Sequence, residues 1–287
     1  MTCKDIEARL MAAGIEDAAT EAKRLFSHFS GLSLAALLAD RSADCTDAAL
    51  EAAVLRRESR EPLAYILGEA WFYEERYRVS PACLVPRQET ELLVAYAIEH
   101  LPEGGLFADF CTGSGCIAVS VLAHRPDLRA HAYDISPDAL ALARENAAAN
   151  GVADRVEFFC ADLLMTGGVC RESRYDMIIS NPPYLTAEDM REAQAEIRHE
   201  PSLALAGGED GLTFYRYFVE HYRANLKRNA PFLFEIGAAE GDDLRALGAQ
   251  NGFAVDILPD YAGLDRVAVL KPTNQGLPLE GKVSGNA

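Results

Sequence analysis

The sequence predicts an α/β protein with an open, mostly parallel seven-stranded sheet that follows a small N-terminal helical domain. Up to about residue 59, apolar residues recur at helical spacing. From about residue 88, short apolar runs alternate with helical stretches, which is typical of a parallel sheet covered by helices on both faces. The last two runs, 254–258 and 266–270, lie too close for a parallel crossover of about a dozen residues. We therefore expect this final pair to be antiparallel.

The N-terminal part, residues 1–68, is predicted to be a helical bundle with its own core. Gly14, Gly31 and Thr46 separate its helical stretches. The predicted helices cover residues 4–13, 17–29, 32–39 and 47–59. The bundle carries no catalytic motif, which makes it a candidate for recognising a macromolecular substrate. A purely stabilising role is the alternative.

Residues 69–87 are predicted to be a linker that contains a β-hairpin, with aromatic residues on either side of the charged turn 74–76. The α/β domain is expected to span residues 88–271. A polar tail with Gly and Pro, residues 272–287, is predicted to be disordered. Glu89, Thr90 and Glu91 precede the first helix of this α/β domain, where they form a helix-capping pattern.

The first predicted strand of the sheet, 106–110, leads into a glycine-containing turn and then a helix from Cys116 to about Ala123. Glycines at such a turn let a ligand approach the backbone closely. The turn residues are Cys111, Thr112, Gly113, Ser114 and Gly115. A single Gly-x-Gly is weak evidence, because most are tight turns.

Two further strand ends carry acidic residues. The strand 130–133 ends in Asp134, nineteen residues after Gly115, where a ribose diol is bound in nucleotide sites. A helix N-cap before Ser136 is the alternative role for Asp134. The strand 155–160 is followed by Asp162 and Leu163, which suit an adenine amino group and an adenine ring, although Asp162 alone is more often a loop or cap residue.

The spacing of the turn disfavours a nicotinamide dinucleotide. Such a loop needs a third glycine for close helix packing, and none follows at the required place. The turn also lacks a basic residue to meet a pyrophosphate. A cofactor with adenosine and no phosphate, such as S-adenosylmethionine, fits better.

The fourth strand, 175–180, ends in the most informative motif, Asn181-Pro182-Pro183-Tyr184. The two prolines make a rigid, non-helical turn. The Asn181 side-chain oxygen and the Pro182 carbonyl are fixed acceptors, suited to holding a flat –NH₂ group by both hydrogens, with an aromatic ring beside them. A turn without chemistry is the alternative, and the three preceding strand ends disfavour it.

At these motifs the chain resembles the HemK/PrmC family of glutamine methyltransferases, which modify class I peptide chain release factors. Three further segments carry the resemblance, which covers about residues 5–271. They are Glu-Pro-Leu-Ala-Tyr-Ile-Leu-Gly at 61–68, Leu-Val-Pro-Arg-Gln-Glu-Thr-Glu at 84–91, and the segment 199–212 with His-Glu-Pro and Gly-Gly-x-Asp-Gly-Leu. Three departures stand out: Cys111 for glycine, Gln88 for proline, and Leu163 where some members have an aromatic residue.

The resemblance implies a Rossmann-like class I methyltransferase that uses S-adenosylmethionine and no metal. Its reaction would methylate the side-chain amide nitrogen of the glutamine in the Gly-Gly-Gln loop of release factors. Asn181, Pro182 and Tyr184 would be catalytic, with Pro183 also binding substrate. The turn 111–115, Asp134, Asp162, Leu163 and Asn181 would bind the cofactor. The loop with Glu89, Thr90 and Glu91 would border cofactor and substrate, which is the alternative to a helix-capping role.

The side-chain nitrogen of the substrate glutamine is a poor nucleophile, because its lone pair is delocalised into the carbonyl. The main task of the enzyme would therefore be to position this nitrogen against the methyl group. No general base is obvious, and we expect the proton to leave after methyl transfer. Glu235 lies at the end of the strand 231–236, and its side chain is a further candidate to lie near the site.

Composition narrows the alternatives. The net charge is −17, with 27 basic against 44 acidic residues, which disfavours a nucleic-acid amino-methyltransferase that shares the Asn-Pro-Pro-Tyr motif. Seven cysteines without a Cys-x-x-Cys pair, no membrane-length apolar run and no signal-peptide pattern predict a cytoplasmic protein. A methyltransferase of ribosomal-protein glutamine and a non-catalytic cofactor-binding module remain alternatives.

Overall fold

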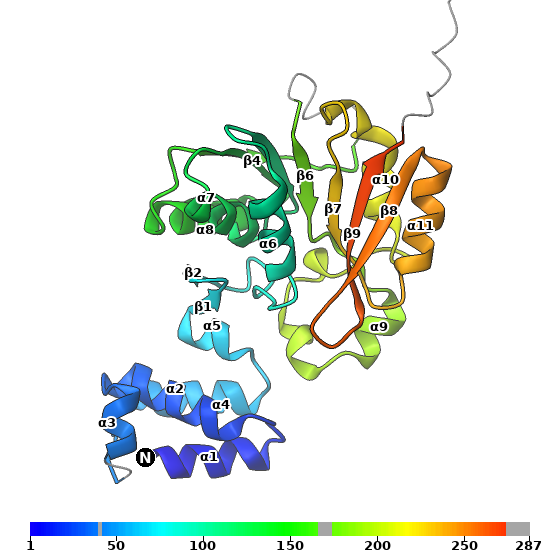
Figure 1. Ribbon diagram of the computed structural model, residues 1–287. Helices are drawn as coiled ribbons and strands as arrows, with labels where there is room; N and C mark the ends of the chain where they lie inside the picture. Colours follow the sequence, from blue (N-terminus) through cyan, green and yellow to red (C-terminus); the bar gives the residue numbers. More distant parts are fainter. Residues whose placement is uncertain (40–41, 166–173, 274–287) are drawn as a thin grey trace, which may run out of the picture.

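The computed structural model describes residues 1–39, 42–165 and 174–273. A group of helices at the N-terminus lies beside an α/β domain, and a short hairpin lies between them (Figure 1). In the described part of the chain, no helix has the length and apolar character needed to cross a membrane.

The N-terminal helices enclose a hydrophobic cluster of their own. It includes Ile6 and Leu10 of the first helix, Leu25 and Phe26 of the second, and Val54 of the fourth, none of them exposed. The helices are α1 (Cys3–Ala12), α2 (Ala18–Ser30), α3 (Leu34–Ala39), α4 (Ala48–Glu58) and α5 (Leu63–Leu67). The first four are close to the predicted stretches. The fifth was not predicted, because five residues are too few to show helical periodicity.

The hairpin consists of β1 (Glu69–Phe72) and β2 (Glu75–Arg78), which pair antiparallel. Phe72 pairs with Glu75, so the turn contains only Tyr73 and Glu74. Tyr73 has a φ of 58°, as a two-residue hairpin turn requires. The charged residues Glu75 and Arg76 therefore belong to the second strand and not to the turn where the sequence placed them.

The large sheet has the order β5-β4-β3-β6-β7-β9-β8 (Figure 1). Its strands are β3 (Leu106–Phe110), β4 (Arg129–Asp134), β5 (Val156–Cys160), β6 (Met177–Ser180), β7 (Phe232–Glu235), β8 (Phe253–Pro259) and β9 (Asp265–Pro272). The first five run parallel, and β9 is antiparallel to both β7 and β8. The predicted seven-stranded sheet with an antiparallel final pair is confirmed.

The last strand extends further than predicted. Pro272 pairs with Phe253 inside β9, and Thr273 donates to the Gly252 carbonyl at 2.9 Å. Both residues had been assigned to the polar tail. The rest of that tail, 274–287, lies outside the described residues.

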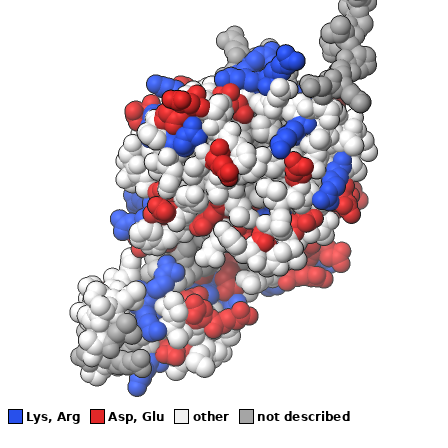
Figure 2. Space-filling model, viewed as in Figure 1, with Lys and Arg blue, Asp and Glu red and all other residues white. Residues whose placement is uncertain are grey.

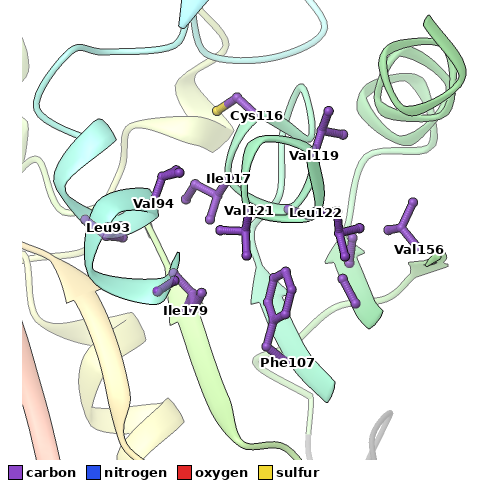
Figure 3. Close-up of a cluster of buried hydrophobic side chains, with 14 of the residues drawn as sticks. Leu93, Val94, Phe107, Cys116, Ile117, Val119, Val121, Leu122, Val156 and Ile179 are labelled. Carbon is purple, nitrogen blue, oxygen red and sulfur yellow. The ribbon is translucent and has the colours of Figure 1, made fainter. Parts of the chain in front are cut away.

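Helices cover both faces of the sheet, as the alternating pattern predicted. On one face, Val94 of α6 and Val121 of α7 pack with Phe107 and Ile179 of the strands (Figure 3). On the other face, Phe218 of α10 packs in a second cluster of the core. The helices of this domain are α6 (Glu91–His100), α7 (Cys116–His124), α8 (Pro137–Ala149), α9 (Ala187–Glu192), α10 (Thr213–His221) and α11 (Gly241–Gln250). Short 3₁₀ turns cover Ala195–His199, Ser202–Ala204 and Arg223–Asn225.

The register of the parallel strands brings four loops to one edge of the sheet. Phe110, the last residue of β3, pairs with Tyr133 on one side and Ser180 on the other. Asp134 at the end of β4 pairs with Cys160 at the end of β5. The loops that follow these strands therefore start side by side, at the edge where ligands bind in open α/β sheets.

Candidate active site

A cavity of about 310 Å³ opens at this edge of the sheet. Nine of the predicted site residues line it: Cys111, Thr112, Gly113, Ser114, Asp134, Asp162, Leu163, Asn181 and Pro183. Gly115, Pro182 and Tyr184 are not among the lining residues, although each adjoins one in sequence. Thr90, from the loop that was expected to lie beside the site, also lines the cavity. The wall further contains residues that were not predicted, chiefly Cys83, Arg87, Ile135, Leu203 and Phe214.

The glycine turn has the backbone that its sequence requires. Gly113 and Gly115 have φ values of 54° and 81°, in the left-handed region that favours glycine. A Cβ on Gly115 would lie 3.1 Å from that of Ala143 in α8, so this glycine permits close packing and does not face the cavity. Cys111 also has a positive φ, 58°, which is uncommon for a residue with a side chain. Burial raises the pKa of its thiol, so the thiol remains protonated, consistent with a small core side chain.

Asp134 ties two of the loops together. One carboxylate oxygen accepts from the backbone N–H of Gly113 at 2.8 Å, and the other accepts from that of Ser136 at 2.9 Å. The cap of α8 is Ser136, whose hydroxyl accepts from Ala139 N–H at 3.2 Å. The alternative role of Asp134 as that cap is therefore wrong. Each of its oxygens accepts one of these bonds and keeps acceptor capacity for a ligand.

The loop after β5 supplies an acidic and an apolar group. Asp162 accepts from the backbone N–H of Leu164 at 2.9 Å, an Asx turn that holds the loop. Leu163 is only 4% exposed, packs in the core and lines the cavity. Its carbonyl accepts from the Tyr222 hydroxyl at 3.0 Å. The loop therefore presents a fixed carboxylate beside an apolar wall.

The Asn181 side chain is held from behind by a contact that sequence reasoning missed. Its Nδ2 donates to the Thr90 hydroxyl at 3.1 Å, which leaves Oδ1 as the acceptor of the amide. Thr90 is the N-cap residue of α6, yet its side chain makes no capping bond. The capping alternative for Thr90 is therefore wrong. Instead its hydroxyl lies 2.5 Å from Glu235 Oε2, and the Tyr184 hydroxyl lies 3.4 Å from Oε1 of the same carboxyl.

The segments 84–91 and 199–212 meet at the cavity through an ion pair. Arg87 donates to Glu200 at 2.7 Å, and the Glu200 side chain is only 1% exposed. Sequence alone did not indicate this pair, although both residues lie in the two segments that carry the family resemblance. Further along, the N–H of Gly207 donates to the Leu185 carbonyl at 2.9 Å, which holds the chain directly after Tyr184.

The helical N-terminal part contacts the same region. Arg57, a buried residue of α4, pairs with Glu21 at 2.5 Å and with Glu196 at 2.9 Å. Arg60 pairs with the other oxygen of Glu196 at 2.9 Å. Glu196 lies in the 3₁₀ turn just before Pro201, which lines the cavity. The bundle is thus connected to the wall of the site.

These residues fit an adenosine-containing cofactor. The cavity lies within the range of about 300–1,000 Å³ that is usual for small-molecule sites. Ile135, Leu163 and Phe214 give apolar walls for a base, and Asp134 gives acceptors for ribose hydroxyls. No cluster of three His, Cys, Asp or Glu residues suitable for a metal occurs among the residues that the structure describes.

Comparison with known proteins agrees with this geometry. Residues 88–208 match the Methyltransferase small domain, and residues 3–68 match the PrmC N-terminal domain. A release factor glutamine methyltransferase of Cereibacter sphaeroides is 42% identical over 264 residues, covering 90% of this chain and 93% of that protein. One of Neisseria gonorrhoeae is 44% identical over 217 residues, covering 75% of this chain and 78% of that protein.

A solved structure supports the fold alone. The crystal structure of a methyltransferase from Pyrococcus furiosus has a TM-score of 0.52 and 18% identity, covering 68% of this chain and 87% of that one. The sequence relatives go further, because the match to the Cereibacter protein covers 90% of this chain and so extends over both of its parts. The family resemblance expected from the motifs is confirmed: the chain belongs to the release factor glutamine methyltransferase family.

Proposed function

We propose that this protein transfers a methyl group from S-adenosylmethionine to the side-chain amide nitrogen of the glutamine in the Gly-Gly-Gln loop of class I peptide chain release factors. One observation carries the proposal beyond family membership. Asn181 lines the adenosine-sized cavity with its Nδ2 bound to Thr90, so its oxygen is left to accept from a substrate amide.

The cofactor supplies an electrophilic methyl group on a sulfonium sulfur. With the cofactor bound, the substrate nitrogen would accept this methyl group while the electron pair of the carbon–sulfur bond goes to sulfur, and the nitrogen would then lose a proton to solvent. Asn181 Oδ1 and the Pro182 carbonyl would accept the two N–H bonds of the substrate amide and direct its lone pair at the methyl. Tyr184 would pack on the flat amide. Positioning of this kind supplies about 7 kcal/mol or more of a barrier.

The cofactor would lie along the ends of β3, β4 and β5. The cofactor would lie close to the backbone of the turn 111–115, and Asp134 would bind its ribose hydroxyls. Asp162 would accept from the adenine amino group, with Leu163 against the ring. All of these residues line the cavity except Gly115, which follows Ser114 and supports the turn from behind.

The proposal also assigns a role to each part of the chain. Residues 1–68 would hold the release factor, residues 69–87 would connect, and residues 88–271 would carry the reaction. The buried Arg57 supports this division, because its pair with Glu196 aligns the bundle with the cavity wall. The site of action would be the cytoplasm, where release factors work.

The distribution of charge favours a protein substrate over a nucleic acid. Lys and Arg are interspersed with Asp and Glu on the face that Figure 2 shows. Binding to a phosphate backbone depends on clustered basic residues. With a net charge of −17, the nucleic-acid alternative has little support.

The test is transfer of labelled methyl to a purified bacterial class I release factor. The control substrate is the same factor with the glutamine of its Gly-Gly-Gln loop changed to alanine. We expect label on the intact factor only. Label on both factors would refute the proposed position. Label on neither, with ribosomal protein or nucleic acid labelled instead, would refute the proposed substrate.

A pair of enzyme variants tests the role of the Asn-Pro-Pro-Tyr turn. Asn181→Ala should lower kcat by at least about a hundredfold, since it removes one of two positioned acceptors. The cofactor dissociation constant, measured by calorimetry, should change less than about threefold. Asn150→Ala makes the same change at the end of α8 and should leave kcat unaltered. Normal turnover of Asn181→Ala would refute the mechanism.

A further inference from the structure

Three side chains from separate elements form a line of hydrogen bonds behind the cavity. Glu235 ends β7, Thr90 stands at the start of α6, and Asn181 follows β6. Thr90 Oγ1 lies 2.5 Å from Glu235 Oε2 and 3.1 Å from Asn181 Nδ2. Glu235 is 1% exposed and Thr90 is 3% exposed. Only Thr90 and Asn181 line the cavity, so Glu235 acts on its contents through them.

The direction of these bonds follows from the number of hydrogens. An ionised carboxylate can only accept, so the hydroxyl of Thr90 must donate its single hydrogen to Glu235. The Thr90 oxygen is then left with lone pairs alone. It can accept from Asn181 Nδ2 but cannot donate to Asn181 Oδ1. The charge on Glu235 therefore decides which end of the Asn181 amide faces Thr90 and which end faces the cavity.

We propose that Glu235 and Thr90 are positioning residues that hold the Asn181 amide with its oxygen toward the substrate, and that a proton on Glu235 removes this control. The inference rests on the proposed function of Asn181 as an acceptor. Once Glu235 is neutral, its own O–H can donate to Thr90, and the Thr90 hydroxyl becomes free to donate to Asn181 Oδ1. The reversed amide would then present N–H groups to the N–H groups of the substrate.

The surroundings of Glu235 make this change occur in an accessible pH range. Burial raises its pKa to about 7. Thr90, Tyr184 and Arg266 face the carboxyl and favour its charged form, while Glu89 opposes it. The positive charge of Arg266 is divided between Glu235 and Asp260, with which Arg266 forms an ion pair at 3.4 Å. The ionised form of Glu235 therefore predominates only above about pH 7, and kcat should fall as pH drops through this value.

This role differs from that of a general base. A base must reach the proton that it removes, directly or through one water. Thr90 stands between Glu235 and Asn181, and Glu235 is absent from the residues that line the cavity. The two roles predict different results for Glu235→Gln. Glutamine is neutral at every pH and can either accept from Thr90 through its oxygen or donate to it through its nitrogen. The positioning role therefore predicts a partial loss of kcat that does not vary with pH, whereas the base role predicts a nearly complete loss.

The experiment measures kcat for release-factor methylation from pH 6 to 9, with cofactor affinity by calorimetry at each end. Thr90→Val removes the link with little change in shape and should lower kcat about a hundredfold, the effect of a small misplacement in an active site. Thr90→Ser keeps the hydroxyl and should restore kcat to within about threefold. Glu235→Gln should stay within about tenfold of the unmodified protein at pH 8 and lose the acidic limb near pH 7. Thr273→Val also removes a threonine hydroxyl that makes a hydrogen bond, just after β9 at the other end of the sheet from the cavity, and is the matched control.

Several outcomes would overturn the inference. Thr90→Val with normal kcat and a normal pH profile would do so, as would Glu235→Gln that keeps the acidic limb. A loss of more than about a thousandfold in Glu235→Gln, with intact cofactor binding, would assign a general base instead. If Thr90→Val does not fold, Thr90→Ser and the Glu235→Gln pH profile decide the question. Failure of the unmodified protein to methylate any release factor would concern the proposed function and not this inference.

Discussion

Gly207 offers a direct test of how closely the Asn-Pro-Pro-Tyr turn must be held. Its φ lies outside the left-handed region, so alanine is compatible with its backbone. Yet a Cβ there would lie 2.4 Å from Tyr184 Cα and 2.6 Å from the Tyr184 carbonyl carbon. Ordinary contact begins near 3.4 Å, so the two backbones must separate by about 1 Å. Neither contacting atom belongs to a flexible side chain that can turn away.

We expect Gly207→Ala to lower kcat about a hundredfold, since a 1 Å misplacement near reacting groups has an effect of that size. Cofactor affinity should change less than about threefold, because Gly113 and Asp134 lie on other loops. The assay is steady-state transfer of labelled methyl at saturating cofactor, with calorimetry for the cofactor. Gly105→Ala is the control. It makes the same change just before β3, at the end of that strand away from the cavity. There the new Cβ would lie 3.0 Å from its nearest neighbour, the Pro102 carbonyl oxygen. This variant should keep kcat even if it lowers the melting temperature. A folded Gly207→Ala protein with normal kcat would refute the reasoning.

Three further changes test other contacts. Asp134→Ala should raise the cofactor dissociation constant, measured by calorimetry, about a hundredfold. The reason is that the backbone N–H groups of Gly113 and Ser136 lose a charged acceptor. An unchanged dissociation constant would contradict this. Arg57→Ala should lower the free energy of unfolding by about 2 kcal/mol in denaturant titrations, below the range for fully buried pairs because both glutamates reach solvent. No loss of stability would show that the pairs contribute little. Phe218→Ala should cost about 3–5 kcal/mol, as its ring is fully buried, and a loss below 1 kcal/mol would contradict the described core.

The parts of the site that the sequence predicted share one property: they follow from local pattern. Apolar runs located β3, β4, β5 and β6, and parallel pairing then required their ends to meet at one edge. Asp134 and Asn181 could be placed together in this way without any knowledge of side-chain contacts. The antiparallel final pair followed from the length of a loop alone.

What the sequence did not predict depends on contacts between distant segments. Thr90 looked like a helix cap because it precedes an apolar-periodic stretch, yet its hydroxyl bonds Glu235, 145 residues away. Arg87 and Glu200 lie 113 residues apart and meet only because the segments 84–91 and 199–212 line one cavity. No local pattern distinguishes a buried ion pair of this kind from two exposed charges.

The position of β9 has a consequence for how the chain acquires its fold during synthesis on the ribosome. Strands β3 to β7 can assemble in the order in which they emerge, but β9 comes last and lies between β7 and β8. Until residues 265–272 leave the exit tunnel, β7 presents an open edge and β8 has no neighbour in the sheet. Val267 pairs with Glu235, so the surroundings of that carboxyl are also completed at this final step. The nascent protein would therefore gain its cofactor-binding loops first, and its full catalytic geometry only after β9 has emerged and paired with β7.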